Sequence, residues 1–279
     1  MSISTTMSKV NSIAIGGFDG MHIAHQELFA KLDDRYGAIV VVETGYANMT
    51  PGIQRQQYTH HPLHIYELMT IKDLDAKGFV QKLMTDFPNL KAIIVGYDFH
   101  FGKDRAYDAS DLKRYFKGEV TVVSEVMHRG VSVHSHIIRE HIKSADFATV
   151  KHLLGRDYSV QGNVVAGQGL GREKLVPTIN VETSQLLPKE GVYATLTRVD
   201  DEVCFHPSVT FFGHRVCTDN SVALETHLID LHVENVAYVE ISFLDFIRDN
   251  QKFENLTLLK EAIDKDISIA RKKLQILEL

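Results

Sequence analysis

Apolar and polar residues follow two different patterns along the chain, and the change falls near residue 155. Before this point, short apolar runs alternate with segments whose apolar residues recur at helical spacing. Such alternation predicts a doubly wound α/β domain with a parallel sheet, whose ligands bind beyond the C-terminal ends of the strands. The predicted strands are 13–15, 38–42, 91–95 and 120–123, the predicted helices are 22–36, 77–87, 108–116 and 136–154, and a long loop covers 46–61.

After Gly155 the pattern changes to alternating β-type segments separated by turns. The predicted strands are 158–165, 191–199, 208–212, 222–229 and 237–243. A last helix is predicted over 256–277, and its apolar stripe consists of Leu259, Ile263, Ile267, Ala270 and Leu274. This pattern is typical of a small antiparallel β-barrel with a C-terminal helix docked on it. We therefore expect two domains, 1–155 and 156–279.

The composition narrows the class of protein. The chain has 279 residues, of which 44% are hydrophobic and 24% charged, and its net charge is −6 with histidine neutral. An acidic chain without a basic patch argues against binding to a nucleic-acid backbone. No apolar run is long enough to cross a bilayer, the first residues lack the apolar core of a signal peptide, and the only cysteines are Cys204 and Cys217. We expect a soluble, cytoplasmic protein with no nucleic-acid or membrane partner.

Glycines and histidines gather where the first predicted strand ends. Gly16, Gly17 and Gly20 form a turn there. His22 and His25 follow three residues apart, which places them on one face of the next helix. Backbone amides, the helix dipole and two imidazoles would together favour the phosphates of a nucleotide triphosphate. The alternative is a tight turn followed by a solvated helical turn, and spacing alone does not decide between the two.

A second candidate site lies in the predicted barrel. The segment 162–180 is rich in glycine, so its backbone amides can approach phosphates. Thr178 and Asn180 offer hard oxygen ligands on one side of an extended segment, where Mg²⁺-ATP could be held. Glycine-rich segments are usually just turns, and that alternative stays open on these residues alone.

Both sites resemble one family, the bifunctional bacterial riboflavin kinase/FMN adenylyltransferases, often called FAD synthetases. The segment 16–25 resembles the signature G-x-F-D-G-x-H-x-G-H, with Ala24 in place of a glycine, and 95–105 resembles V-G-x-D-F-x-F-G-x-x-R. The segments that resemble the riboflavin kinase module in order and spacing are 154–162, 177–180, 188–194 and 224–230. The resemblance covers nearly the whole chain, residues 12–272.

For the N-terminal domain, the resemblance implies transfer of AMP from ATP to FMN, which yields FAD and pyrophosphate. It implies that His22 and His25 are catalytic. The residues implied to bind ATP or its phosphates are Gly16, Phe18, Asp19, Gly20, Asp98, Ser135 and Arg139. Two departures bear on this activity: His134 and His136 replace the usual hydroxyl residues, and 43–51 replaces the family's Phe-x-Pro-x-Pro stretch.

For the C-terminal domain, the resemblance implies phosphorylation of riboflavin to FMN by ATP. The implied phosphate-binding residues are Gly167, Gly171 and Arg172, and the implied ligands of Mg²⁺ are Thr178 and Asn180. Glu225 would accept the proton of the riboflavin 5′-hydroxyl as a general base. The plain alternative is that Glu225 is one polar residue on the wet face of a strand. Arg248 is a further candidate for contact with flavin or phosphate.

We therefore expect a transferase that makes FAD from riboflavin in two ATP-dependent steps, both with Mg²⁺. One alternative is a riboflavin kinase whose adenylyltransferase domain is weakened or inactive. Another is a non-catalytic sensor of flavin or nucleotide. The remaining cluster of histidines, His60, His61 and His64, is expected to form a polar loop rather than a metal site.

Overall fold

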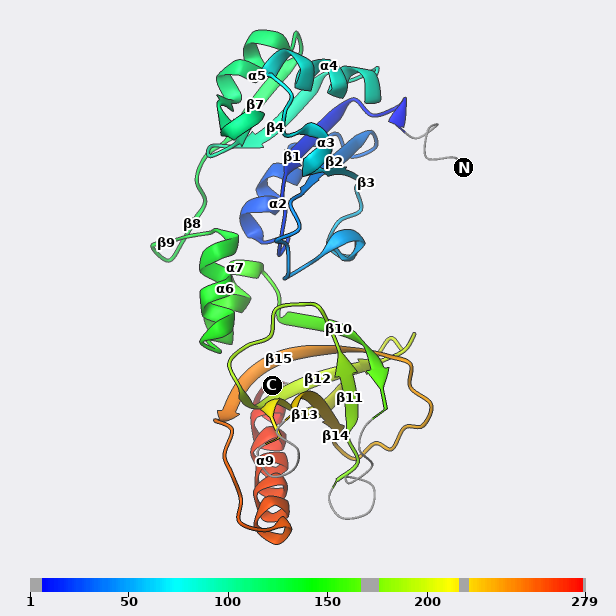
Figure 1. Cartoon of the computed structure of the whole chain (residues 1–279), viewed down its shortest axis with the longest axis vertical. Helices are drawn as coiled ribbons and strands as arrows, with labels where there is room; N and C mark the ends of the chain where they lie inside the picture. Colours follow the sequence, from blue (N-terminus) through cyan, green and yellow to red (C-terminus); the bar gives the residue numbers. More distant parts are fainter. Residues whose placement is uncertain (1–6, 167–175, 216–220, 278–279) are drawn as a thin grey trace. The chain divides into compact units, whose positions relative to one another are not determined.

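A computed structural model describes residues 7–166, 176–215 and 221–277 of the chain (Figure 1). The chain divides into two compact units, residues 1–135 and 136–279, and each is described by itself. Among the helices in these described ranges, none is both long and apolar enough to cross a membrane.

The first unit is built on a five-stranded parallel sheet with the strand order β3-β2-β1-β4-β7. Its strands are β1 (Ser12–Gly16), β2 (Gly37–Glu43), β3 (Leu63–Glu67), β4 (Ala92–Gly96) and β7 (Glu119–Val123). Its helices are α2 (Ile23–Phe29), α3 (Leu68–Ile71), α4 (Ala76–Asp86) and α5 (Ala109–Tyr115). Its smaller elements are η1 (Gly52–Tyr58), η2 (Lys103–Arg105), β5 (His100–Phe101), β6 (Tyr107–Asp108), β8 (Met127–His128) and β9 (Val131–Ser132).

Apolar side chains cover both faces of this sheet. Ile13 of β1 packs into a core that includes Phe79 of α4 and Leu112 of α5. Its neighbour Ala14 points the other way, into a core that includes Leu28 of α2. Side chains alternate between the two faces of a strand, so a continuous apolar run fills both cores. The predicted doubly wound α/β domain is confirmed.

Two predictions about local structure in the first unit are wrong. The predicted helix 22–36 ends at Phe29, because the side chain of Asp33 accepts hydrogen bonds from the backbone amides of Arg35 and Tyr36 and holds a turn there. The strand β2 begins at Gly37, directly after the predicted end of that helix. The structure also contains β3, which the sequence analysis did not predict, at the edge of the sheet.

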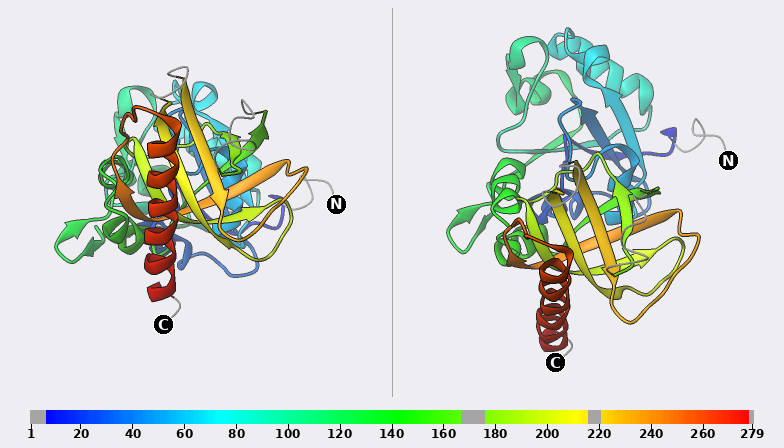
Figure 2. Two further views of the ribbon diagram at one scale, coloured as in Figure 1. Left: turned by 90° about the horizontal axis from the view of Figure 1, so that it is seen from below. Right: turned by 60° about the horizontal axis from the view of Figure 1, so that its bottom comes forward.

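The second unit is a closed barrel with the strand order β10-β11-β14-β13-β12-β15. Its strands are β10 (Tyr158–Val165), β11 (Ile179–Glu182), β12 (Gly191–Val199), β13 (His206–His214), β14 (Val222–Leu228) and β15 (Tyr238–Arg248). All of the strand pairs that the barrel contains are antiparallel. Figure 2 shows α9 (Leu256–Leu277) against the outside of this barrel. The predicted barrel and C-terminal helix are confirmed.

The helix α9 docks through the apolar stripe that its sequence predicts. Ala270 and Leu274 are buried, and Ala270 packs with Val192 of β12 and Val209 of β13. Partly buried Ile267 packs against the same cluster. The stripe therefore faces the barrel, as expected for an amphipathic helix.

The interior of the barrel contains a network of hydroxyl groups. Its members are Thr195, Thr197, Ser208, Thr210 and Thr226, and none of them is exposed to solvent. Hydrogen bonds of 2.7–3.2 Å connect the five side chains. Since each buried hydroxyl has a partner, the network avoids the cost of an unpaired polar group. This part of the interior is filled by side chains, so a substrate must bind on the outer surface or at an end.

The helical segment 136–154 forms two helices, α6 (Ser135–Lys143) and α7 (Phe147–Leu154). The break lies at Ala145, which has a φ of 60°, and at Asp146, whose carboxylate accepts from the amide of Thr149 and caps α7. Phe147 stacks on Phe243 of the barrel with ring centroids 5.5 Å apart. The compact units therefore divide before these helices, whereas the sequence predicts a boundary near 155–157. The functional division into 1–155 and 156–279 stays a prediction.

Candidate active sites

The glycine loop of the first unit follows β1, beside the neighbouring strand β4. The strand order reverses here, because β2 and β3 lie on one side of β1 while β4 and β7 lie on the other. Ligands of open α/β sheets bind at such points. Phe18 and Met21 have the unusual φ values of 49° and 45°, which turn the chain sharply towards α2. A Cβ atom at Gly16 would lie 3.0 Å from the ring of Phe18, so a larger residue there would require this ring to shift.

The two histidines of the loop lie against each other. Their rings stack with centroids 3.5 Å apart and an interplanar angle of 19°. The rings of Phe18 and His25 meet edge to face, with centroids 5.1 Å apart. His22 is buried and His25 is half-buried. Because α2 has only seven residues, its dipole is small. The imidazoles and the loop amides must therefore provide most of the attraction for an anion at this site. The catalytic role of the pair stays a prediction.

Asp19 connects the glycine loop to the segment that replaces the family's Phe-x-Pro-x-Pro stretch. Its buried carboxylate accepts from the backbone amides of Met49 at 3.0 Å and Thr50 at 2.8 Å. It also accepts from the amide of Asn48 at 3.2 Å. In return, the amide of Gly20 donates to the hydroxyl of Thr50 at 2.7 Å. The carboxylate thus holds two loops together, and contact of Asp19 with a phosphate stays a prediction.

Arg55 of η1 reinforces the same junction, and its side chain is fully buried. Its Nη1 donates to the carboxylate of Glu43 at 2.9 Å and to the carbonyl oxygen of Gly52 at 3.1 Å. Its Nε donates to the carbonyl oxygen of Phe18 at 3.4 Å. The sequence carries no signal for this role, since an arginine in a polar segment is normally solvated.

Asp98 and Ser135, two predicted ATP-binding residues, lie near the glycine loop. The hydroxyl of Ser135 donates to the carbonyl oxygen of Asp19 at 2.8 Å. Asp98 is the second residue after β4, and its carboxylate lies 4.0 Å from Nδ1 of His134. The hydroxyl of Tyr97 lies 2.9 Å from Nε2 of His134. Partial burial and the nearby carboxylates raise the pKa of Tyr97, so this hydroxyl stays protonated at neutral pH.

The structure does not test several other predicted ligands. Arg139 lies on α6, in the second unit. The phosphate-binding candidates Gly167, Gly171 and Arg172 lie outside the described residues.

The predicted base and a predicted metal ligand of the barrel lie side by side. Asn180 of β11 and Glu225 of β14 are paired residues of adjacent antiparallel strands. The neighbour of Glu225, Thr226, points into the barrel and is fully buried, so Glu225 points outward. Thr178 comes one residue before β11, and Nδ1 of His227 lies 2.8 Å from the carbonyl oxygen of the preceding Pro177. The structure therefore brings Thr178, Asn180 and Glu225 to one place on the barrel.

Sequence reasoning missed Arg215, which joins two of these residues. Its Nη2 donates to Oδ1 of Asn180 at 2.6 Å, and its Nε donates to Oε1 of Glu225 at 2.7 Å. The residue directly follows β13, which is adjacent to β14 in the barrel. Only its position next to a strand end could have drawn attention to it.

Arg248 makes a contact that its predicted flavin or phosphate role does not require. Its guanidinium donates to both carboxylate oxygens of Asp266 in α9, at 3.0 Å and 2.7 Å. The Asp266 side chain is 4% exposed. A two-point arginine–carboxylate contact of this kind is among the stronger ion pairs in proteins. The observed contact thus anchors α9 on the barrel.

Replacing Arg248 with alanine is expected to lower the free energy of unfolding by about 3 kcal/mol, because it leaves a buried carboxylate without its partner. Urea unfolding of the whole chain, followed by circular dichroism, measures this change. The matched control is Lys273→Ala, which removes an exposed ion pair between α9 and Asp245 and should cost less than about 1 kcal/mol. Weaker riboflavin binding with unchanged unfolding would contradict the anchoring role.

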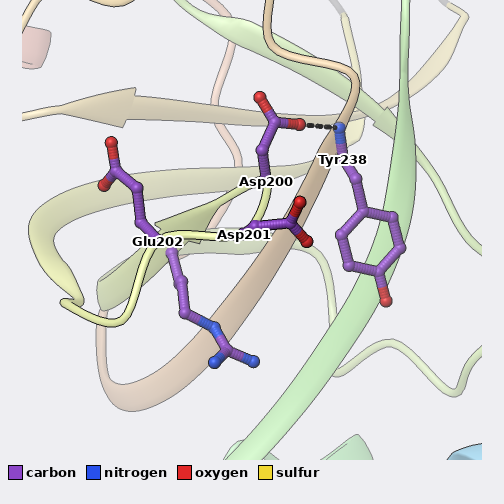
Figure 3. A pocket seen from close by; sticks show the side chains of 5 residues that line it. Asp200, Asp201, Glu202 and Tyr238 are labelled. Atoms are coloured by element: carbon purple, nitrogen blue, oxygen red, sulfur yellow. Dashed lines mark hydrogen bonds between the residues drawn. The ribbon is translucent and has the colours of Figure 1, made fainter.

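A hollow of about 490 Å³ lies elsewhere on the barrel, at the hairpin between β12 and β13 (Figure 3). Its lining residues are Arg198, Asp200, Asp201, Glu202 and Tyr238. The carboxylate of Asp200 accepts from the amide of Tyr238 at 2.9 Å. The strand register puts this hairpin beyond the pair Thr197 and His206, whereas Arg215 follows the opposite end of β13. The hollow therefore does not coincide with the Asn180–Glu225 site.

The three histidines His60, His61 and His64 lie at the start of β3 or just before it. His60 pairs with Asp34 at 3.2 Å, while His61 is buried. His64 contacts the rings of Tyr66 and Phe87. Burial lowers the pKa of both His61 and His64, which favours neutral imidazoles. The described part of the chain contains no group of three or more His, Cys, Asp or Glu residues placed to hold a metal.

Comparison with known proteins identifies the family. Residues 154–274 match a family model for riboflavin kinase, and residues 68–137 match one for FAD synthetase. A bifunctional riboflavin kinase/FMN adenylyltransferase from Pseudomonas fluorescens is 31% identical, over 92% of this chain and 91% of its own length. A protein of the same description from Listeria monocytogenes is 26% identical, over 94% of this chain and 91% of its own.

Among solved structures, the chain is similar to a crystal structure described as that of a macrolide-efflux protein from Streptococcus pneumoniae. The two share 26% identity and a TM-score of 0.80, with 94% of each chain covered. The fold therefore matches along both units, and the two bifunctional relatives cover 92% and 94% of this chain. This chain belongs to the family of bifunctional riboflavin kinase/FMN adenylyltransferases.

Proposed function

We propose that this chain makes FAD from riboflavin in two successive steps. In the first, the barrel transfers the γ-phosphoryl group of ATP to riboflavin and forms FMN. In the second, the N-terminal domain transfers AMP from another ATP to FMN, which yields FAD and pyrophosphate. The observation that carries the proposal is the pairing of Asn180 with Glu225 on adjacent strands, within the residues that match riboflavin kinase. The chain also belongs to a family of bifunctional enzymes.

In the kinase step, Glu225 is the general base. Its carboxylate points outward from β14, and there it can take the proton of the riboflavin 5′-hydroxyl as the oxygen attacks the γ-phosphorus. General-base help of this kind increases a rate by about 10²–10⁴-fold. The base does not need to form a covalent bond, since the hydroxyl itself is the nucleophile.

The oxygens of Thr178 and Asn180 fit a bound Mg²⁺. Both are hard, uncharged oxygen ligands of the type that Mg²⁺ accepts alongside phosphate oxygens. Oδ1 of Asn180 already accepts a hydrogen bond from a cationic group, Nη2 of Arg215, so this oxygen is directed at a cation position. When bound, Mg²⁺ would neutralise part of the charge on the phosphates of ATP. The side chains of Thr178 and Asn180 would hold and orient it.

In the adenylyl-transfer step, the glycine loop and the histidine pair act on the phosphates of ATP. The reaction needs alignment and charge neutralisation more than a covalent nucleophile. The stacked rings of His22 and His25 lie at the switch point of the sheet, where they can donate to phosphate oxygens. Asp98 and Ser135 complete the proposed ATP-binding set within this unit, together with the backbone of Gly16, Phe18, Asp19 and Gly20. The role of Arg139 in binding ATP rests on the resemblance alone.

The test is to supply the purified chain with ATP and Mg²⁺ and to separate the flavins by chromatography. Riboflavin should be converted to FMN, and FMN supplied alone should be converted to FAD. FMN formation without FAD would support a riboflavin kinase with an inactive N-terminal domain. That candidate is favoured by the replaced segment 43–51, whose residues Asn48 to Thr50 bind the carboxylate of Asp19. No turnover of either flavin would favour a sensor.

A further inference from the structure

Arg215 lies at the centre of the proposed kinase site. Its Nη2 is 2.6 Å from Oδ1 of Asn180 and 2.6 Å from Oε1 of Glu225. Its Nε donates to the same oxygen of Glu225 at 2.7 Å, and its Nη1 donates to the hydroxyl of Ser221 at 2.9 Å. One guanidinium group therefore contacts both the proposed metal ligand and the proposed base.

The backbone around Arg215 is held from two sides. Its amide donates to the carbonyl oxygen of Ser221 at 2.8 Å, which continues the pairing of β13 with β14. The preceding residue, His214, donates its amide to Glu190, and Nδ2 of Asn250 donates to the carbonyl oxygen of His214 at 2.8 Å. A side chain that starts from such an anchored position is pre-organised for its contacts. The side chains of Arg215 and Glu225 are 20% and 22% exposed, so a substrate can still reach them.

The position of the guanidinium has a direct consequence for the reaction. The proposed base must reach the attacking hydroxyl, and the proposed metal ligands must hold the phosphates of ATP. The γ-phosphate therefore has to lie beside both Glu225 and Asn180, and Nη2 of Arg215 contacts both of these residues. A planar guanidinium presents several N–H donors and matches phosphate oxygens with two parallel hydrogen bonds. If Asn180 used Oδ1 to hold Mg²⁺, Nη2 of Arg215 would lose one acceptor, and a phosphate oxygen could replace it.

We infer that Arg215 is a catalytic residue that binds the phosphoryl group during its transfer, and this inference rests on the proposed kinase function. In this step the riboflavin 5′-oxygen forms a bond to the γ-phosphorus, and the bond between that phosphorus and the β,γ-bridging oxygen breaks. ADP leaves with the bond electrons, and the hydroxyl proton passes to Glu225. Arg215 keeps its own protons throughout and stabilises the negative charge on the equatorial oxygens. Before ATP binds, the same guanidinium holds Asn180 and Glu225 together.

The test compares two substitutions in the whole chain. Arg215→Gln keeps hydrogen-bond donors but removes the charge, so kcat for FMN formation should fall by about 100-fold, with the KM for riboflavin within about 3-fold of its original value. Arg215→Lys keeps the charge but not the two-point contact, and kcat should fall by only about 10-fold. The matched control is Arg198→Gln, which removes another arginine–glutamate pair, with Glu240, near the opposite end of β13. It should leave kcat unchanged.

Other results of this experiment would overturn the catalytic role of Arg215. A kcat within about 3-fold of the unsubstituted protein in Arg215→Gln would overturn the inference. Equal losses in the Gln and Lys variants, together with a lower unfolding midpoint, would show a structural ion pair instead. If Arg215→Gln does not fold, Arg215→Lys decides, because unchanged kcat in that variant also overturns the inference. Failure of the unsubstituted protein to form FMN would instead disprove the proposed kinase function, and the inference with it.

Discussion

Replacing Glu225 with glutamine is expected to lower the rate of FMN formation from riboflavin by about 10³-fold. Glutamine has nearly the same shape and keeps an oxygen that can accept from Arg215, so the surrounding contacts should persist. It cannot take a proton from the riboflavin 5′-hydroxyl, however, and the attacking oxygen then has to lose its proton to water. The loss should therefore appear in kcat, with little change in the KM values of riboflavin and ATP.

The measurement is steady-state FMN formation, with FAD formation from supplied FMN as the internal control. The N-terminal domain should keep its activity in this variant. The matched substitution is Glu182→Gln, which changes an exposed glutamate on the neighbouring strand β11 and should have no effect. Unchanged FMN formation in Glu225→Gln would show that Glu225 is not the base but a polar residue on the solvent-exposed face of a strand. It would also favour the non-catalytic sensor.

Replacing His25 with alanine is expected to abolish FAD formation, with a loss of at least about 10³-fold, and to spare the kinase. The substitution removes one of two stacked imidazoles and one donor for the phosphates of ATP. It also removes the edge-to-face contact between the rings of Phe18 and His25, so the glycine loop loses part of its packing. Both effects act at the switch point of the sheet and should leave the barrel unaffected.

Both activities must be measured on the same preparation. FMN formation should remain close to that of the unsubstituted protein, which would show that the chain folds. The matched control is His60→Ala, which removes an exposed histidine paired with Asp34 in the same unit and should leave FAD formation unchanged. Equal loss of both activities in His25→Ala would contradict the assignment of the two steps to separate domains.

The sequence predicts most of the architecture because the main elements carry strong local signals. The side chains of the continuous apolar run 38–42 are all removed from water only if both faces of the strand are buried, and this run forms the central part of β2. The stripe with Ala270 and Leu274 predicts α9 and the face that it buries. The limits of the predicted helix 22–36 were wrong because a side chain–backbone turn at Asp33 competes with the helix, and this competition leaves no mark in the apolar spacing.

The boundary near residue 155 illustrates a second limit. Periodicity shows that 136–154 is helical, but a helical pattern does not say which core buries its apolar face. The stacking of Phe147 on Phe243 joins α7 to the barrel, and that contact spans a long stretch of sequence. The chain therefore divides by packing at a different place from where its pattern of secondary structure changes.

The sequence by itself determined the α/β and β-barrel architecture, the residues of the two candidate sites and the resemblance to a family, because these depend on local spacing and on short motifs. Only the tertiary structure decided which side chains meet. It paired Asn180 with Glu225 through strand register and placed Arg215 between them. It also showed that the carboxylate of Asp19 binds the backbone of a neighbouring loop and that Arg248 forms an ion pair with α9. Such contacts join residues far apart in the chain, and their geometry follows from packing and register rather than from spacing.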